Sequence, residues 1–135
     1  KASEYDVSVA EIASGEKHGF KATVTSKDGG YVDPAGEFAI SYVYKTWNDT
    51  DKVWIYTTSG VTENVSNAIV TIPTDKKVSS VTGEFLLDNA DAILVFGFAT
   101  FSFKGTSVTG AEEDVTVHSP VIMCVSEIQA VVGKP

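Results

Sequence analysis

Apolar and polar residues alternate along most of this chain of 135 residues, which is the pattern of half-buried β-strands. In Tyr5–Ala13, for example, Tyr5, Val7 and Val9 share one face. Such segments recur about every ten residues and are separated by turn-forming residues such as Gly, Pro, Asp and Asn. The pattern predicts strands at Tyr5–Ala13, Gly19–Ser26, Glu37–Trp47, Lys52–Ser59, Val65–Ile72, Val78–Leu87, Ile93–Phe103 and Val115–Val132, the last bent at Pro120.

These eight strands predict an all-β protein. The sequence shows no convincing 3.6-residue period with the end caps of an α-helix. A chain of this length buries roughly two-thirds of its unfolded surface, which suits one domain covering residues 1–135. Two antiparallel sheets packed as a β-sandwich, with a jelly-roll or Ig-like topology, are therefore expected.

The strand Ile93–Phe103, with the sequence ILVFGFATFSF, departs from the alternation because both of its faces are apolar. One face would carry Ile93, Val95, Ala99, Phe101 and Phe103, and the other Leu94, Phe96 and Phe98. The second face is either covered by a loop of the same chain or forms a groove that another chain fills, since large exposed apolar patches usually mark interaction sites. The candidate groove residues are Ile93, Leu94, Phe96, Phe98, Phe101 and Phe103.

Residues that could carry catalysis are sparse. His18 and His118 lie far apart in the sequence and are predicted to be surface residues. The sequence has no GxSxG, HExxH, CxxC or GxxxxGK motif. Cys124, the only cysteine, stands among apolar neighbours and is predicted to be a buried core residue. We therefore do not expect an enzyme.

The charge of the chain narrows the classes of partner that it can bind. The formal net charge is −8, and all ten basic residues are lysines. Nucleic acid and anionic membranes are therefore poor partners, and no apolar run reaches the roughly 18 residues of a membrane-spanning helix. The sequons Asn48-Asp49-Thr50 and Asn64-Val65-Ser66 weakly favour an extracellular location. A start at Lys1 is typical of a mature or trimmed chain.

Four acidic loops are candidate calcium sites. Calcium takes six to eight oxygen ligands, and turns supply them as carboxylates and backbone carbonyls. The candidate ligands are Asp28, Asp33, Asp49, Asp51, Asp88, Asp91, Glu112, Glu113 and Asp114. The alternative is that Asp and Asn stand in these loops only because they form turns well.

Aromatic residues flank the NDTD turn. Trp47 and Trp54 stand on either side of it, and Tyr56 lies on the same side of its strand as Trp54. Exposed flat aromatics hold sugar rings in many carbohydrate-binding modules, whereas a cross-strand aromatic pair that only stabilises the hairpin is more common. A sugar-binding or adhesive module of a secreted protein is therefore the alternative function.

Our leading hypothesis is a structural subunit of an extracellular filament. An incomplete sandwich can accept a strand from a neighbouring copy, which pairs along a sheet edge and places alternate side chains in pockets. This hypothesis explains the two apolar faces of Ile93–Phe103 and of the terminal segment VIMCVSEIQAVV. It requires an unpaired edge beside Ile93–Phe103, whereas sugar binding requires Trp47, Trp54 or Tyr56 on one flat exposed face.

The whole-chain character resembles the subunits of cannulae, the extracellular tubules of hyperthermophilic archaea. The resemblance lies in the opening KASEYDVSVAEIASGEKHGF, the acidic turns NDTD and DNAD, the absence of arginine and the two-faced strands. It implies a jelly-roll-like sandwich, assembly of identical subunits with Ca²⁺, and an N-terminal strand that completes a neighbour's sheet. Because this chain starts almost directly with its first strand, a donor segment would have to precede Lys1.

Overall fold

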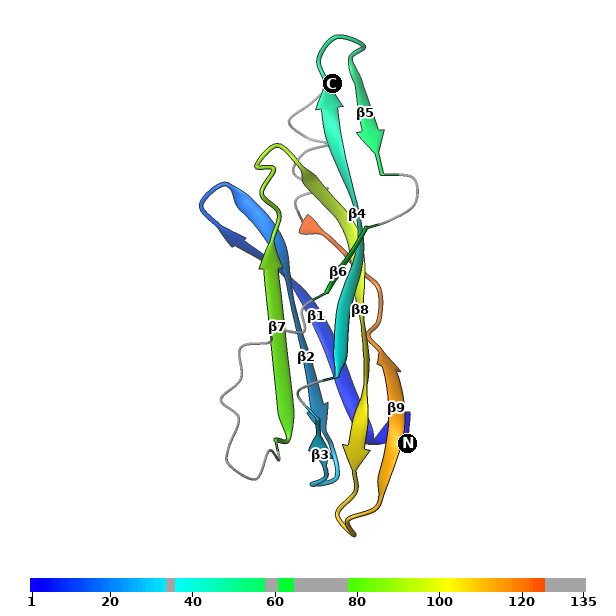
Figure 1. Cartoon of the computed structure of the whole chain (residues 1–135). Helices are drawn as coiled ribbons and strands as arrows, with labels where there is room; N and C mark the ends of the chain where they lie inside the picture. The colour runs from blue at the N-terminus through cyan, green and yellow to red at the C-terminus, as the bar shows by residue number, and fades with distance from the viewer. Residues whose placement is uncertain (34–35, 58–60, 65–77, 126–135) are drawn as a thin grey trace.

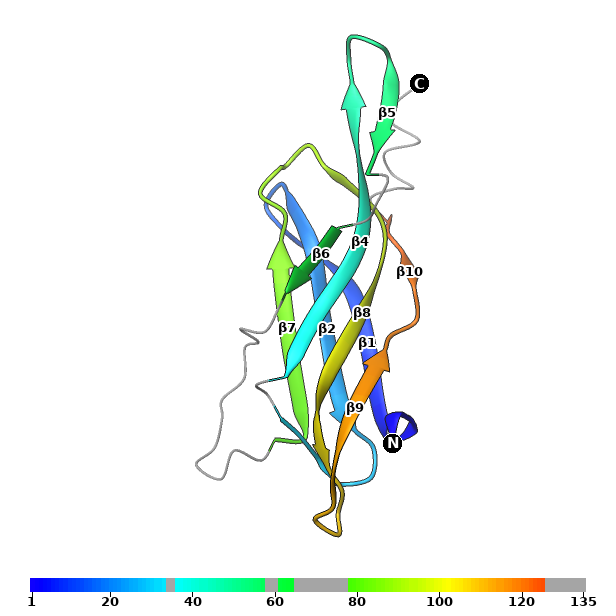
Figure 2. The same cartoon turned by 45° about the vertical axis from the view of Figure 1, so that its right-hand side comes forward.

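The chain folds into two antiparallel β-sheets that pack face to face (Figures 1 and 2). The structure is a computed structural model, and it describes residues 1–33, 36–57, 61–64 and 78–125. These residues form ten strands, preceded by a short 3₁₀ turn, η1 (Ala2–Glu4). The predicted antiparallel β-sandwich is therefore confirmed. In this described part, no helix has the length and apolar character needed to cross a bilayer.

The smaller sheet has the strand order β1-β2-β7. Its strands are β1 (Tyr5–Ser14), β2 (Lys17–Ser26) and β7 (Ser80–Leu86). Gly15 turns β1 into β2 with a φ of +61°, a conformation that glycine adopts without steric strain. As predicted, Phe20, Ala22 and Val24 of β2 are buried against the other sheet.

The larger sheet is built around one long strand, β8 (Ile93–Thr106). The strands β4 (Glu37–Asn48) and β3 (Tyr31–Val32) pair with one side of β8, and β9 (Glu112–His118) and β10 (Ile122–Met123) pair with the other. Beyond β4 lie β5 (Val53–Tyr56) and β6 (Val61–Asn64). In the described part of the chain, this sheet is therefore four strands wide and faces a sheet that is three strands wide.

Apolar side chains from both sheets fill the space between them. Phe20 and Phe101 are fully buried, and the Phe20 ring lies 5.7 Å from that of Tyr42 across the sandwich. Burial of each such side chain contributes about 1.5–3 kcal/mol. Cys124 is 1% exposed and belongs to the core, as predicted.

A β-bulge changes the faces of β8. Leu94 pairs with Tyr44 and Phe96 pairs with Val43, so Val95 is an extra residue without a partner on β4. Leu94 consequently faces the core together with Phe101. The prediction that Leu94 shares a face with Phe96 is wrong, because strict alternation holds only on one side of a bulge.

Most predicted strands lie within a few residues of their expected bounds. The segment after β2 was predicted as loop but contains the short strand β3. The predicted terminal strand divides near Pro120 into β9 and β10. The predicted strand Val65–Ile72 lies outside the described residues, and β6 was not predicted.

Candidate functional site

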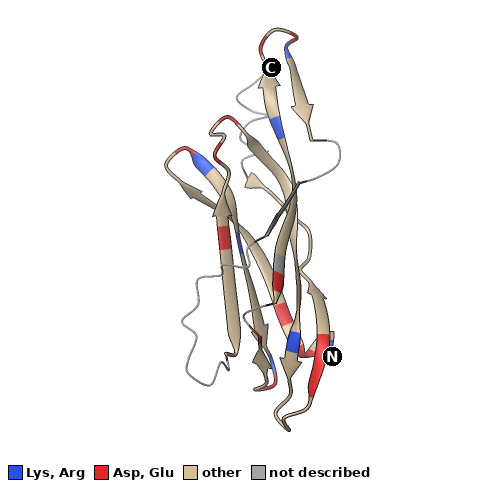
Figure 3. Ribbon diagram, in the orientation of Figure 1, with Lys and Arg blue, Asp and Glu red and all other residues tan. Residues whose placement is uncertain are grey.

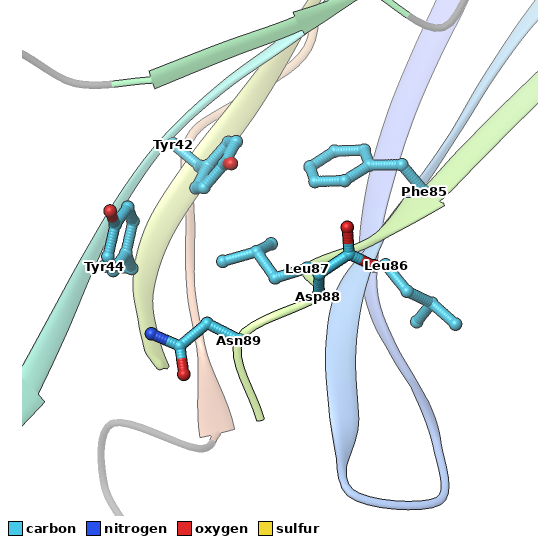
Figure 4. Close-up of a pocket in the computed structure, with 7 residues that line it drawn as sticks. All are labelled: Tyr42, Tyr44, Phe85, Leu86, Leu87, Asp88 and Asn89. Carbon is cyan, nitrogen blue, oxygen red and sulfur yellow. The ribbon is translucent and has the colours of Figure 1, made fainter. Parts of the chain in front are cut away.

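A pocket of about 410 Å³ opens between the two sheets, where β7 ends and the chain continues toward β8 (Figure 4). Its lining residues come from β4, β7 and the following loop, and they are Tyr42, Tyr44, Phe85, Leu86, Leu87, Asp88 and Asn89. The rings of Tyr42 and Phe85 lie 5.3 Å apart between centroids. Rings and aliphatic chains thus line the pocket together with the polar side chains of Asp88 and Asn89, so its surface is part apolar and part polar.

The pocket lies beside a margin of the smaller sheet. Among the described strands, β7 pairs only with β2. Leu87 N donates to His18 O at 2.8 Å, and Ser26 N donates to Ser79 O at 2.9 Å. Between these two bonds, every second residue of β7 counted from Leu87 directs its backbone N–H and C=O groups at β2. The backbone groups of Thr82 and Glu84 therefore point away from β2, toward the margin.

Beyond β4 the larger sheet continues with β5 and β6, which pair with different parts of β4, and β5 stands past the end of β7 (Figure 1). Val53 and Ile55 of β5 are 49% and 50% exposed. Ile55 pairs with Thr46, two residues from Tyr44, so it occupies the face that Tyr44 turns toward the smaller sheet. The wider sheet therefore leaves apolar surface open beyond the pocket.

The predicted groove on β8 is divided between two faces. Leu94, Phe101 and Phe103 lie in the core, whereas Phe96 is half-buried on the outer face of the larger sheet. Ile93 and Phe98 share that outer face of the sheet. Ile93 pairs with Lys45, whose side chain lies on the same face. Along the described chain β8 has neighbours on both sides, and Ser119 N also donates to Ala99 O at 2.9 Å. Among the described strands, β8 therefore has no unpaired edge, whereas β7 pairs only with β2.

The NDTD turn between β4 and β5 is organised by its own hydrogen bonds. Asn48 Oδ1 accepts from the backbone N of Thr50 and of Asp51, both at 3.0 Å. Asp49 Oδ1 accepts from Trp47 Nε1 at 3.3 Å and from Lys52 Nζ at 3.0 Å. These contacts fit the interpretation of Asp and Asn as turn-forming residues.

The remaining acidic loops have similar local contacts. Asp28 Oδ1 accepts from Gly30 N at 3.2 Å, and Asp88 lies 3.4 Å from Lys17 Nζ. Asp114 lies 3.9 Å from Lys104 Nζ, and Glu113 pairs with the α-amino group of Lys1. Within residues 1–33, 36–57, 61–64 and 78–125, no three acidic, histidine or cysteine side chains are grouped so that they could hold a metal ion.

The acidic loops nevertheless gather at the two ends of the sandwich (Figure 3). The antiparallel pairing puts the turns with Asp49, Asp51, Asp88 and Asp91 at one end. It puts Asp28, Asp33, Glu112, Glu113 and Asp114 at the other end. Calcium coordination at either end stays a prediction.

The aromatic residues of the β4–β5 hairpin surround a lysine that the sequence did not single out. Lys45 is fully buried, and its Nζ lies 4.4 Å from the ring centroid of Trp54 and 5.4 Å from that of Tyr56. Trp47 pairs directly with Trp54, and their rings meet at 67° with centroids 5.2 Å apart. One sugar ring cannot stack on both indoles in this T-shaped arrangement, so the pair resembles a hairpin-stabilising contact.

The two histidines lie far apart: His18 is near the start of β2, and His118 ends β9 opposite Thr100 in the middle of β8. His18 Nδ1 is 3.8 Å from Glu11 Oε2, while Glu11 Oε1 accepts from Val125 N at 2.7 Å. His118 Nδ1 lies 3.1 Å from Thr100 Oγ1 on the exposed face of β9. Neither imidazole lines the pocket between β4 and β7.

No protein-family model matches this chain, and a search of well-characterised proteins also finds no match.

Proposed function

We propose that this chain is a structural subunit of an extracellular filament or tubule and that identical copies join by β-strand donation. The observation that carries the proposal is the pocket lined by Tyr42, Phe85 and Leu87 beside the margin of β7, where, among the described strands, the smaller sheet is one strand narrower than the sheet it faces. A strand added there would pair with β7 along the margin that no described strand occupies.

The outward backbone groups of β7 support this mode of assembly. Ser80, Thr82, Glu84 and Leu86 direct their N–H and C=O groups toward the margin, as the ladder to β2 requires. An incoming strand would bond these groups and send alternate side chains inward. The inward side chains nearest Phe85 and Leu87 would enter the pocket, which supplies specificity.

Calcium fits the proposal as a bridge between subunits. A head-to-tail contact brings the acidic turns at one end of a copy close to the acidic loops at the opposite end of the next copy. Like charges that face each other repel, so such a contact needs a cation between them. Calcium accepts carboxylates from two chains as readily as from one.

A proline at position 84 tests the strand donation. Glu84→Pro removes an N–H that points to the margin, while the hydrogen bonds from β7 to β2 stay in place. In a chain extended at its N-terminus by a donor segment, we expect a soluble, folded variant. Its self-association with calcium, followed by sedimentation velocity and electron microscopy, should be weakened at least about tenfold, or ~1.4 kcal/mol.

Glu84→Thr is the matched control, because it removes the same charge but keeps the N–H and favours an extended strand. It should assemble like the wild-type chain. A wild-type chain that is extended at its N-terminus by a donor segment and still stays monomeric with and without calcium would contradict the proposal. So would a Glu84→Pro variant that assembles as well as Glu84→Thr.

A further inference from the structure

The edge strand β5 is short, which itself limits edge pairing, but it lacks the other devices that keep sheet edges apart. Its residues Val53, Trp54, Ile55 and Tyr56 carry no charge and include no proline. Among the described strands β5 pairs only with β4, in a continuous register without a bulge. Natural sheets protect such edges with lysine, proline or bulges, and an edge without them is prone to pair with another strand.

The ladder between β4 and β5 shows which backbone groups face outward. Thr57 N donates to Tyr44 O at 3.0 Å, so Thr57 and Tyr44 form a hydrogen-bonded pair. By alternation, Ile55 and Val53 also direct their backbone groups toward β4. Trp54 and Tyr56 therefore present their N–H and C=O groups at the open edge.

We infer that β5 is a self-association edge that pairs antiparallel with β5 of a second copy, about a twofold axis at Ile55. This inference rests on the proposed function, because a filament subunit needs lateral contacts as well as strand donation. In this register Trp54 of each copy exchanges hydrogen bonds with Tyr56 of the other. The contact is isologous, so each copy contributes the same edge.

The register follows from the conformation of Lys52. A register centred on Trp54 would need Lys52 to pair with Tyr56 of the second copy. Lys52 has a φ of +57° and belongs to the turn, so it cannot extend the ladder. The register centred on Ile55 uses only extended residues. It also places Trp54 opposite Tyr56, an aromatic cross-strand pair of a kind that stabilises sheets.

The charge distribution favours a second copy in this antiparallel orientation. With a net charge of −8, two copies repel over most of their surfaces. The acidic residues nearest to β5, Asp49 and Asp51, lie in the turn before it. Antiparallel pairing puts the turns of the two copies at opposite ends of the joined strands, next to the uncharged Tyr56 and Thr57, whereas parallel pairing would bring the turns together.

A contact made by one four-residue strand is small. It falls well below the roughly 1,600 Å² that a stable complex usually buries. It therefore acts as a weak lateral contact, which gains strength when strand donation already holds copies at a high effective concentration. A covalent trap is the appropriate way to detect it.

The test compares two equally exposed positions on the same face of β5. Opposed residues in a non-hydrogen-bonded antiparallel pair have Cα atoms about 4.5 Å apart, which is within the range of a disulfide. Ile55→Cys should therefore form a disulfide-linked dimer under mild oxidation. In the same register the two copies of Val53→Cys stand about 14 Å apart along the strands and should not cross-link.

We expect Ile55→Cys to dimerise at least about tenfold faster than Val53→Cys, or ~1.4 kcal/mol in favour of the cross-link at Ile55. The wild-type chain is the blank, because its Cys124 is buried. Equal rates for the two variants, or no dimer from either, would overturn the inference. Adding Glu84→Pro to both variants separates the two proposals. If assembly is lost while Ile55→Cys still cross-links, the β5 contact is supported independently of strand donation at β7.

Discussion

At the scale of single residues, Tyr5, the first residue of β1, shows how tightly the core is packed at the end of the sandwich that holds β3. Tyr5 is 7% exposed, and its ring meets that of Phe103 edge to face, with centroids 4.9 Å apart. Its hydroxyl donates to Tyr31 O at 3.4 Å. A Cβ on Gly105 would lie only 2.4 Å from that hydroxyl, so glycine is required there.

This environment predicts a loss of stability at alkaline pH. Burial raises the pKa of Tyr5 above its ordinary value of about 10, and the carboxylates of Asp28, Glu4 and Glu113 add to the rise. The unfolded chain therefore ionises first, so the contribution of Tyr5 is complete below pH 10 and is lost as the pH rises from there through the folded pKa. Urea unfolding between pH 8 and 11 measures this loss.

Tyr5→Phe removes the titrating group and serves as the comparison. At pH 8 the substitution should lower the free energy of unfolding by about 1 kcal/mol, because the hydrogen bond of the hydroxyl is lost. Above pH 10 its free energy of unfolding should fall less steeply than that of the wild-type chain, which controls for the lysines that both proteins share. Parallel pH profiles for the two proteins would contradict the prediction.

At the scale of elements, the distance between the two sheets depends on a glycine in β8. Gly97 follows the bulge at Val95 and faces the core. A Cβ at this position would lie 2.8 Å from Cζ of Phe20 on β2 and 3.2 Å from the backbone O of Ser41. The absence of a side chain at Gly97 therefore lets the Phe20 ring lie directly against β8.

Gly97→Ala should destabilise the fold by about 1–3 kcal/mol, because the added methyl group overpacks a closed core. The free energy of urea unfolding measures this cost. Shortening the opposing ring in the double variant Gly97→Ala/Phe20→Leu should show a favourable coupling between the two sites. If Gly97→Ala unfolds like the wild-type chain, or if the two changes are additive, the close approach of Phe20 to β8 is refuted.

At the scale of the whole molecule, the acidic residues at both ends of the sandwich predict that calcium raises the stability of the fold. One site loaded at a hundredfold excess over its dissociation constant adds about 2.7 kcal/mol to the free energy of unfolding. The double variant Asp49→Asn/Asp51→Asn should reduce the gain in melting temperature that calcium produces. Glu84→Gln, which removes an exposed charge from the middle of β7, should keep the gain. An unchanged gain in the double variant would exclude the NDTD turn as a major site.

The alternation of residues was sufficient to predict the sandwich and most of its strands, although not β3 or β6. Tyr5, Val7 and Val9, like Phe20, Ala22 and Val24, lie on the predicted faces because period-two burial is a local property of an extended chain. The burial of Cys124 followed from its apolar neighbours in the same way. Contact between the two indoles across the NDTD turn was one of the two interpretations of this pair, whereas their T-shaped geometry was not predicted.

By itself, the sequence determined that this chain forms alternating strands in two packed sheets with acidic turns, because hydrophobic period and turn chemistry act over a few residues. Only the tertiary structure decided the rest. The bulge that moves Leu94 into the core depends on the register with Tyr44. The pocket depends on β4 and β7 meeting across the sandwich, and the open margin depends on the unequal widths of the two sheets. Such features arise from pairing between segments far apart in the chain, and local alternation carries no information about them.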